Sequence, residues 1–285
     1  MRLMFGVVIV TCAVPVLVAC NAPATQAQDG RVIVSQGPIG RDACGPCALF
    51  NWLSQGGGQL QSVLTELSAE KTPLQTVQHI IDTYGKRESA TKRRVTRYGP
   101  HNGGVGSVNL MIMAREVLDD HLESPPTLRG EYLHQHEDES TEEHLDRIAG
   151  WFSNSIEAGV PVLFYVRSYQ RRSDRAKPRM IFGHHIVITS IDTDTPPTKS
   201  GVSRARITFV DSGTGRVGTG YLSVARADFT APTFTYELRD GRAAQTESVR
   251  TGRPLLEIRS LNFEAPGDSD NKIVVAHFAT FAESQ

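Results

Sequence analysis

The sequence predicts an α+β protein, with a helical N-terminal part and an antiparallel sheet built from the C-terminal half. Before about Val160, apolar residues recur at helical spacing, whereas short β-branched runs dominate from Val160 onward. Helices that precede strands, rather than alternating with them, favour an α+β arrangement over a parallel sheet. The formal net charge of −1 gives no electrostatic reason to expect a nucleic-acid partner.

The N-terminus predicts export. Arg2 precedes a nearly uninterrupted apolar run, Leu3–Ala19, which is shorter than the roughly 20 residues of a transmembrane helix. Residues 1–19 are therefore interpreted as a signal peptide. Residues 20–30 are small and polar and cannot bury enough surface to fold alone, so they are expected to form a flexible tether.

The end of this run, Leu17-Val18-Ala19-Cys20, resembles the bacterial lipobox. The resemblance implies that cleavage leaves Cys20 as a lipidated first residue, so the protein would be a lipoprotein of the bacterial cell envelope. Asn21 after the cysteine implies, by analogy with Gram-negative sorting, an outer-membrane anchor with the domain facing the periplasm. A plain secretory signal with an ordinary cysteine is the alternative.

Residues 31–285 are expected to form one domain, whose elements follow from local signals. Pro46 suits the first turn of a helix because it has no backbone donor to lose there, and Thr72-Pro73 is typical of a cap followed by a first turn. The predicted helices cover 43–52, 60–67, 74–84, 107–122 and 141–159, the last ended by Gly159. The predicted strands cover 31–36, 160–169, 180–192, 204–213, 233–238, 254–261 and 272–281.

Two cysteines remain for chemistry, because Cys12 leaves with the signal and Cys20 is expected to carry lipid. Cys44 and Cys47 lie within one predicted helical turn, so the chain is no disulfide scaffold. A helix N-terminus favours the thiolate form of Cys44. This position is suitable for a nucleophile.

A base and an orienting acid are available later in the chain. His184 and His185 open an apolar strand, and Asp211 ends the next strand before a glycine-rich turn. A cysteine nucleophile needs an adjacent base that a third group holds in place. Neighbouring residues of a strand point to opposite faces, so only one of the two histidines can face Cys44.

Four motifs follow one another along the chain: Gln36, Asp42-Ala43-Cys44-Gly45-Pro46, Gly183-His184 and Phe209-Val210-Asp211. Together they resemble the papain-like cysteine peptidases, and the resemblance covers 31 to about 228. The most similar group is the bacteriocin-processing (double-glycine leader) peptidases. The resemblance implies a papain-like fold, with the nucleophile helix packed on the sheet. It implies Cys44 as nucleophile, His184 as general base, Asp211 as orienting residue and Gln36 as oxyanion donor.

The sequence departs from that family in three places. Gln36 lies farther ahead of Cys44 than the family's residue does, and Ser212 follows Asp211 where the family has proline. There are also two candidate histidines; alignment with the family strand favours His184 over His185. The expected activity is cleavage of peptide or isopeptide bonds in a peptide or protein substrate, with no cofactor and no metal.

Cys44-Gly45-Pro46-Cys47 also equals the thioredoxin motif, in which one thiol attacks and the other resolves. Pro125-Pro126-Thr127 resembles the turn that faces the thioredoxin disulfide. A thioredoxin-like oxidoreductase is therefore the alternative, although it leaves His184 and Asp211 unexplained and expects early parallel strands. A catalytically silent papain-like binding protein is a third possibility, and a Cys44–Cys47 disulfide would silence the nucleophile.

Other signals are weaker. The basic segments Lys86–Arg97 and Arg171–Arg179 are expected to be loops; the first is interpreted as solvated, with a contact to anionic lipid or cell wall as the alternative. Gly213–Gly220 leads into a strand, which disfavours phosphate binding, and Ser212 lacks the context of a nucleophile. The cluster His134, His136, Glu137, Asp138 and His144 has no recognised metal-ligand spacing and is expected to form an acidic loop before a helix.

Overall fold

The computed structural model describes residues 25–28, 30–99, 104–170, 179–199, 201–224, 235–239, 244–248, 255–260 and 272–283. The predicted signal peptide, Cys20 and the first part of the tether lie outside the described residues, as do positions 171–178 of the basic loop. Within the described ranges the chain is a mixture of helices and antiparallel strands. The predicted α+β class is confirmed at that level.

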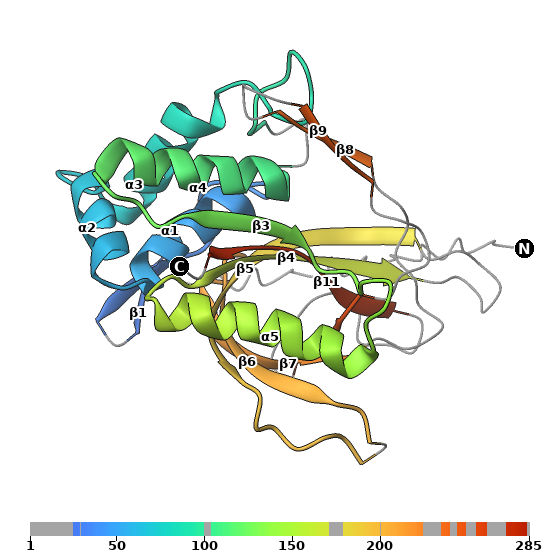
Figure 1. Ribbon diagram of the computed structural model, residues 1–285. Coiled ribbons are helices and arrows are strands. Elements are labelled where there is room, and N and C mark those ends of the chain that lie inside the picture. Colours follow the sequence, from blue (N-terminus) through green and yellow to red (C-terminus); the bar gives the residue numbers. More distant parts are fainter. Residues whose placement is uncertain are drawn as a thin grey trace, which may run out of the picture.

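The helical part comes first along the chain (Figure 1). Its elements are α1 (Cys44–Gln55), α2 (Gly58–Leu67), α3 (Pro73–Ile80), a π-helical turn η1 (Ile81–Gly85) and α4 (Ser107–His121). The cap predicted at Thr72 is a full capping box, in which Thr72 and Gln75 satisfy each other's backbone N–H groups.

The strands form one large sheet in the order β10-β7-β6-β5-β4-β11-β3. Its members are β3 (Leu128–Tyr132), β4 (Val162–Gln170), β5 (Arg179–Asp192), β6 (Arg204–Asp211), β7 (Arg216–Ser223), β10 (Glu257–Ser260) and β11 (Lys272–Ala282). A further pairing of β10 with β11 closes the sheet on itself. Two hairpins, β1 (Thr25–Gln28) with β2 (Arg31–Val34) and β8 (Thr235–Arg239) with β9 (Ala244–Ser248), complete the described strands.

The two faces of the sheet bury different clusters, as alternation along a strand requires. On β5, Val187 joins the cluster around α1, whereas Ile186 and Ile188 join the cluster that includes Phe152. Phe152 belongs to α5 (Thr141–Glu157), which lies across the sheet from α1–α4 in Figure 1. Helix α5 begins at a Ser140/Glu143 capping box and is followed by Gly159 in a left-handed conformation, φ 79°.

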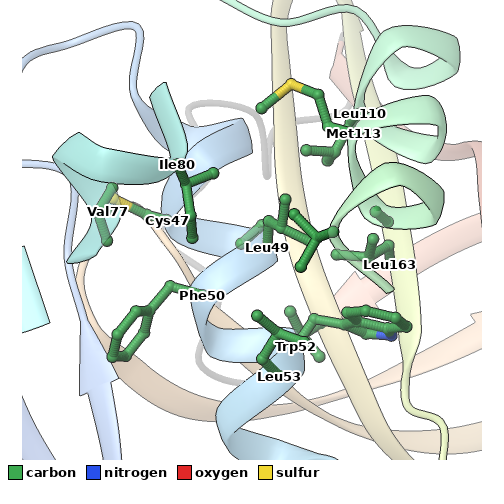
Figure 2. Packing of buried hydrophobic residues seen from close by; sticks show 14 of the residues in the cluster. Cys47, Leu49, Phe50, Trp52, Leu53, Val77, Ile80, Leu110, Met113 and Leu163 are labelled. Carbon is green, nitrogen blue, oxygen red and sulfur yellow. The ribbon is translucent and has the colours of Figure 1, made fainter. Parts of the chain in front are cut away.

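Helix α1 occupies the centre of the helical part. Every residue from Gly45 to Ser54 is buried, so this helix has no solvent face. The Asn51 amide accepts from Val34 N–H at 2.8 Å and donates to Val34 C=O at 3.0 Å, and Trp52 Nε1 donates to Pro161 C=O. Figure 2 shows the packing of α1, with Cys47 directed toward Val77 and Ile80 of α3. The position of Cys44 is thus held by a helix anchored on several sides.

Several segments differ from the sequence-based expectation. Residues 25–28, which were expected to belong to the flexible tether, form strand β1, because the backbone groups of β2 pair with them. Strand β3 was not predicted; it lies between α4 and α5 in the chain and pairs with the C-terminal half of β11, a contact that local periodicity cannot show. The segment Lys86–Arg97 is only partly solvated, because Arg97 forms a two-pronged ion pair with Glu116. Its tip, Lys92–Arg94, is exposed. No helix in the described ranges combines the length and apolar character needed to cross a membrane.

Candidate active site

Cys44 is the first residue of α1 and is partly buried, whereas Cys47 is fully buried; both are free thiols. Within the described chain no side chain caps this helix start, and no acidic residue lies in its first turn. The first backbone N–H groups of a helix have no partner inside it and carry the positive end of its dipole. Cys44 therefore lies where a negative charge on sulfur or on a bound oxygen is stabilised.

His184 on β5 and Asp211 at the end of β6 lie together beside this helix start. His184 Nε2 lies 2.6 Å from Asp211 Oδ1, and a second hydrogen bond joins His184 with Cys44. Since Nε2–H donates to the carboxylate, Nδ1 is the ring nitrogen available to the thiol. The structure thus brings Cys44, His184 and Asp211 together in a hydrogen-bonded chain, with His184 between the other two.

The charges in this hydrogen-bonded chain favour a protonated imidazole. Burial alone lowers the pKa of His184, but the hydrogen bonds to Asp211 and Cys44 outweigh it and raise that pKa to about 9. Burial also opposes ionisation of Asp211, but hydrogen bonds from His184 and its neighbours lower the pKa of this carboxyl. The arrangement places a protonated imidazole beside the Cys44 sulfur, which is the charge partner that a thiolate nucleophile needs.

Asp211 is oriented by the turn that follows it. Gly213 N–H donates to Oδ1 at 2.8 Å, and Thr214 Oγ1 donates to Oδ2 at 2.8 Å. A Cβ at Gly213 would lie 3.1 Å from His184 Cε1, so glycine allows the turn to pass close to the ring. The glycine-rich stretch 213–220 therefore supports the carboxylate before leading into β7.

His185 takes a different position. Its Nε2 donates to the carbonyl of Val105 at 3.0 Å, and burial lowers its pKa to about 3, which keeps the ring neutral. The ring lies beneath the start of α1, near Gly45. His184, and not His185, hydrogen-bonds with both Cys44 and Asp211.

Gln36 lies on the loop before α1 and is tied to the site through its backbone. Its N–H donates to Ser212 C=O at 2.8 Å, one residue after Asp211. The side-chain Oε1 is buried without a hydrogen-bond partner among the described residues. Ser212 itself has a structural role, because its hydroxyl donates to His185 C=O at 2.5 Å.

Two aromatic residues near the site were not identified from the sequence. Phe182 stacks on His184 with ring centroids 5.4 Å apart; the two residues share one face of β5, so strand alternation is the signal that could have revealed this pair. The pKa of Tyr98 is raised by burial and by the nearby Asp42, Cys47 and Cys44. No local pattern links Tyr98 to Cys44, because only tertiary packing brings them together.

The residues cited for the thioredoxin-like alternative do not gather in the same way. Burial, together with the nearby Cys44, raises the pKa of Cys47 far above the usual range of a thiol. Pro125, Pro126 and Thr127 line a separate groove with residues 57–60 and the end of α5. All described strand pairings are antiparallel, whereas that alternative expects parallel strands.

The His134–His144 segment is organised by an ion pair, in which Arg147 binds Glu139 through two nitrogens and also donates to His134 C=O. In the part of the chain that the structure describes, no group of three or more His, Cys, Asp or Glu side chains is placed to hold a metal ion. Comparisons of this chain with protein-family models, with curated proteins and with solved structures found no match.

Proposed function

We propose that this protein is a thiol-dependent hydrolase with a papain-like fold, which cleaves peptide or isopeptide bonds. The observation that carries the proposal is the line Cys44–His184–Asp211, in which a partly buried thiol, an imidazole and an oriented carboxylate are hydrogen-bonded in sequence. Cys44 is the nucleophile, His184 the general acid and base, and Asp211 a positioning residue that holds the imidazole.

In the first half of the reaction, the Cys44 thiolate attacks the carbonyl carbon and a C–S bond forms while the carbonyl electrons move to oxygen. The His184 imidazolium then gives its proton to the leaving amine as the C–N bond breaks, which leaves a thioester. In the second half, His184 takes a proton from an attacking water. Collapse of this intermediate breaks the C–S bond, releases the carboxylic acid and restores the Cys44 thiolate. An amine in place of water would give transfer.

The negative oxygen that forms in both halves needs hydrogen-bond donors. The backbone N–H groups at the start of α1 point to the side where Cys44 lies, and we assign the Gln36 amide as the second donor. Its buried Oε1 leaves Nε2 as the end of the amide that can reach a substrate. The backbone bond from Gln36 to Ser212 keeps this loop beside Asp211.

The arrangement of elements supports the papain-like assignment. The nucleophile begins a buried helix that packs on an antiparallel sheet, and the base and the acid lie on the neighbouring strands β5 and β6. These are the relations that the resemblance of the sequence motifs implies. With the lipobox-like Leu17–Cys20, the proposal extends to a lipid-anchored enzyme of the bacterial envelope, facing the periplasm.

The first test is the pH dependence of iodoacetamide alkylation at Cys44, on reduced protein that begins at Asn21 and so retains β1. If the proposal holds, His184→Ala removes most of the reactivity at pH 6, whereas Cys47→Ala retains it. If His184→Ala changes nothing and Cys47→Ala abolishes disulfide exchange, the thioredoxin-like function replaces the hydrolase. Alkylation of unmodified Cys44 no faster than a model thiol would instead indicate a silent binding protein.

A further inference from the structure

Among the described residues, one long strand beside the candidate site is paired on both of its edges over only part of its length. Strand β5 pairs with β4 from Arg179 to Ile188, but with β6 only from Ile186 to Asp192. Among the described residues, the segment Arg179–His185 therefore has no partner strand on its β6 side. This free edge, Arg179–Gly183, lies directly ahead of His184 in the chain.

The direction of the backbone groups at this edge follows from one hydrogen bond. His185 C=O accepts from the Ser212 hydroxyl, so His185 turns its backbone groups to the β6 side. In an antiparallel strand, N–H and C=O of one residue point to the same side, and alternate residues share that side. Gly183 thus directs its N–H and C=O to the unpaired side, while His184 bonds toward Val166 of β4.

Three neighbouring side chains along the free edge are apolar, and two of them are exposed. Met180 is 47% exposed and Ile181 is 41% exposed; these two are the exposed large apolar side chains of the described chain. Phe182 is partly buried and stacks on His184, so an apolar surface leads from the exposed strand to the base. A register shift lies in this stretch, and such irregularities often end pairing or redirect a strand next to a site.

We propose that the free edge of β5, Arg179–Gly183, binds the substrate as an added β-strand, so that the substrate is an extended peptide with apolar side chains. The inference deepens the proposed function and rests on it. Main-chain hydrogen bonds to Gly183 would hold the peptide regardless of its sequence, and Met180 and Phe182 would contact alternate side chains.

The position of the edge explains why the occupant would be a substrate. The same strand continues from Gly183 into His184, which hydrogen-bonds with Cys44. A peptide that pairs parallel to Arg179–Gly183 therefore ends its strand beside the imidazole, where Ser212 and Asp211 occupy the β6 side of β5. Pairing in register would place a carbonyl of the peptide at Cys44. The peptide would then lose its freedom of motion on binding rather than in the attack itself, which lowers the entropic part of the barrier.

The test uses peptidyl acyloxymethyl ketones. The Cys44 thiolate would attack the methylene carbon of the probe, form a thioether and release the carboxylate. Probes of one to four apolar residues are compared on the unmodified protein, with iodoacetamide as the reference that lacks a peptide. We expect the rate constant for inactivation to rise at least tenfold with chain length. Single N-methylation should then lower it about tenfold at alternate amides only, because only alternate N–H groups face the strand edge. Each N-methyl probe is the matched control for its neighbour.

A second measurement reports on the edge without using a rate of reaction. Hydrogen exchange of the Gly183 amide, followed by NMR after attachment of the four-residue probe, should slow at least tenfold. The His184 amide, which faces β4, should change little. The inference is overturned if the inactivation rate constant does not depend on chain length or N-methylation. It is also overturned if the Gly183 amide exchanges equally fast with and without the probe.

The outcomes separate this inference from the proposed function. If iodoacetamide reactivity depends on His184 but the inactivation rate constant does not change with probe length or N-methylation, the strand-edge inference is wrong and the proposed hydrolase function still holds. If iodoacetamide reactivity does not depend on His184, both the hydrolase function and the strand-edge inference are wrong. Protection of Gly183 that rises with protein concentration in the absence of probe would mean that a second copy of the chain covers the edge, and this also overturns the substrate assignment.

Discussion

The Nε2 atom of His184 lies 2.6 Å from Oδ1 of Asp211, although the two residues are separated by a whole hairpin of the chain. Adjacent strands produce this contact, because Ile186 pairs with Asp211 and His184 lies on the same face two residues earlier. The contact fixes both the tautomer and the direction of the imidazole, which is the condition for its bond with Cys44.

Asp211→Asn should narrow the pH range of Cys44 reactivity. The carboxylate helps to raise the pKa of His184 to about 9, so its loss lowers that pKa and removes the imidazolium at a lower pH. We expect the alkylation rate at pH 8 to fall about fourfold, because a thiol without an imidazolium partner has a pKa of about 8.5 and is only about a quarter ionised there. Asp194→Asn, at an exposed position after β5, is the matched control. An unchanged profile in Asp211→Asn would mean that the carboxylate does not act on His184.

His185 should make the protein sensitive to acid. Its folded pKa of about 3 lies below the unfolded value of about 6.5, so it adds no stabilisation above pH 6.5 and an increasing penalty below it. Between pH 7 and pH 4 this lowers the free energy of unfolding by roughly 3 kcal/mol. His185→Gln retains an N–H donor toward Val105 but cannot titrate, so its urea-denaturation midpoint should depend less on pH. The control is His136→Gln at an exposed position; equal acid slopes in all three proteins would contradict the prediction.

His184 should contribute at the opposite end of the pH scale. Its folded pKa is raised, so its stabilisation is complete below pH 6.5 and disappears as the pH rises through about 9. The shift corresponds to roughly 3 kcal/mol. Chemical denaturation at pH 7 and pH 10 should show this loss in the unmodified protein and a smaller one in His184→Gln. A pH-independent stability over that interval would show that no imidazolium is held.

Cys47 should be protected from reagents in the folded protein. Its side chain is fully buried and its pKa is raised by burial, so neither access nor thiolate formation is favoured. Mass spectrometry after brief alkylation at pH 8 should find label on Cys44 and little on Cys47, and urea should expose both. Rapid labelling of Cys47 without denaturant would contradict this and would favour the redox alternative.

Asn51→Leu should destabilise the fold without removing a residue of the candidate site. The substitution leaves the N–H and C=O of Val34 buried and unpaired, at a cost of roughly 2–4 kcal/mol in the free energy of unfolding. Gln59→Leu, at an exposed position of α2, is expected to change stability by less than about 0.5 kcal/mol. Urea denaturation at pH 7 compares the two; equal stabilities would show that the bonds to Val34 contribute nothing net.

Much of the fold follows from local patterns. The Thr72 cap, Gly159 after α5 and the alternation of Ile186, Val187 and Ile188 each depend on neighbours a few residues away, and each element forms where it was predicted. Strand β3 was missed because its pairing partner, β11, is supplied by the far end of the chain. The partial burial of the Lys86–Arg97 segment was missed for the same reason, since Glu116 lies on another helix.

For the candidate site, too, some features follow from local sequence and others only from tertiary structure. The sequence by itself determined that Cys44 begins a helix, that His184 lies on a strand and that Asp211 ends one, because these are properties of local composition and periodicity. The expectation that the histidines open their strand was wrong, since β5 begins at Arg179. Only the tertiary structure decided that His184 rather than His185 joins Cys44 to Asp211 and that Phe182 covers the ring. It also decided that Arg179–His185 of β5 has no partner strand on the β6 side among the described residues. Those relations depend on which strands become neighbours and in which register, and this is set by packing of the whole core rather than by any segment alone.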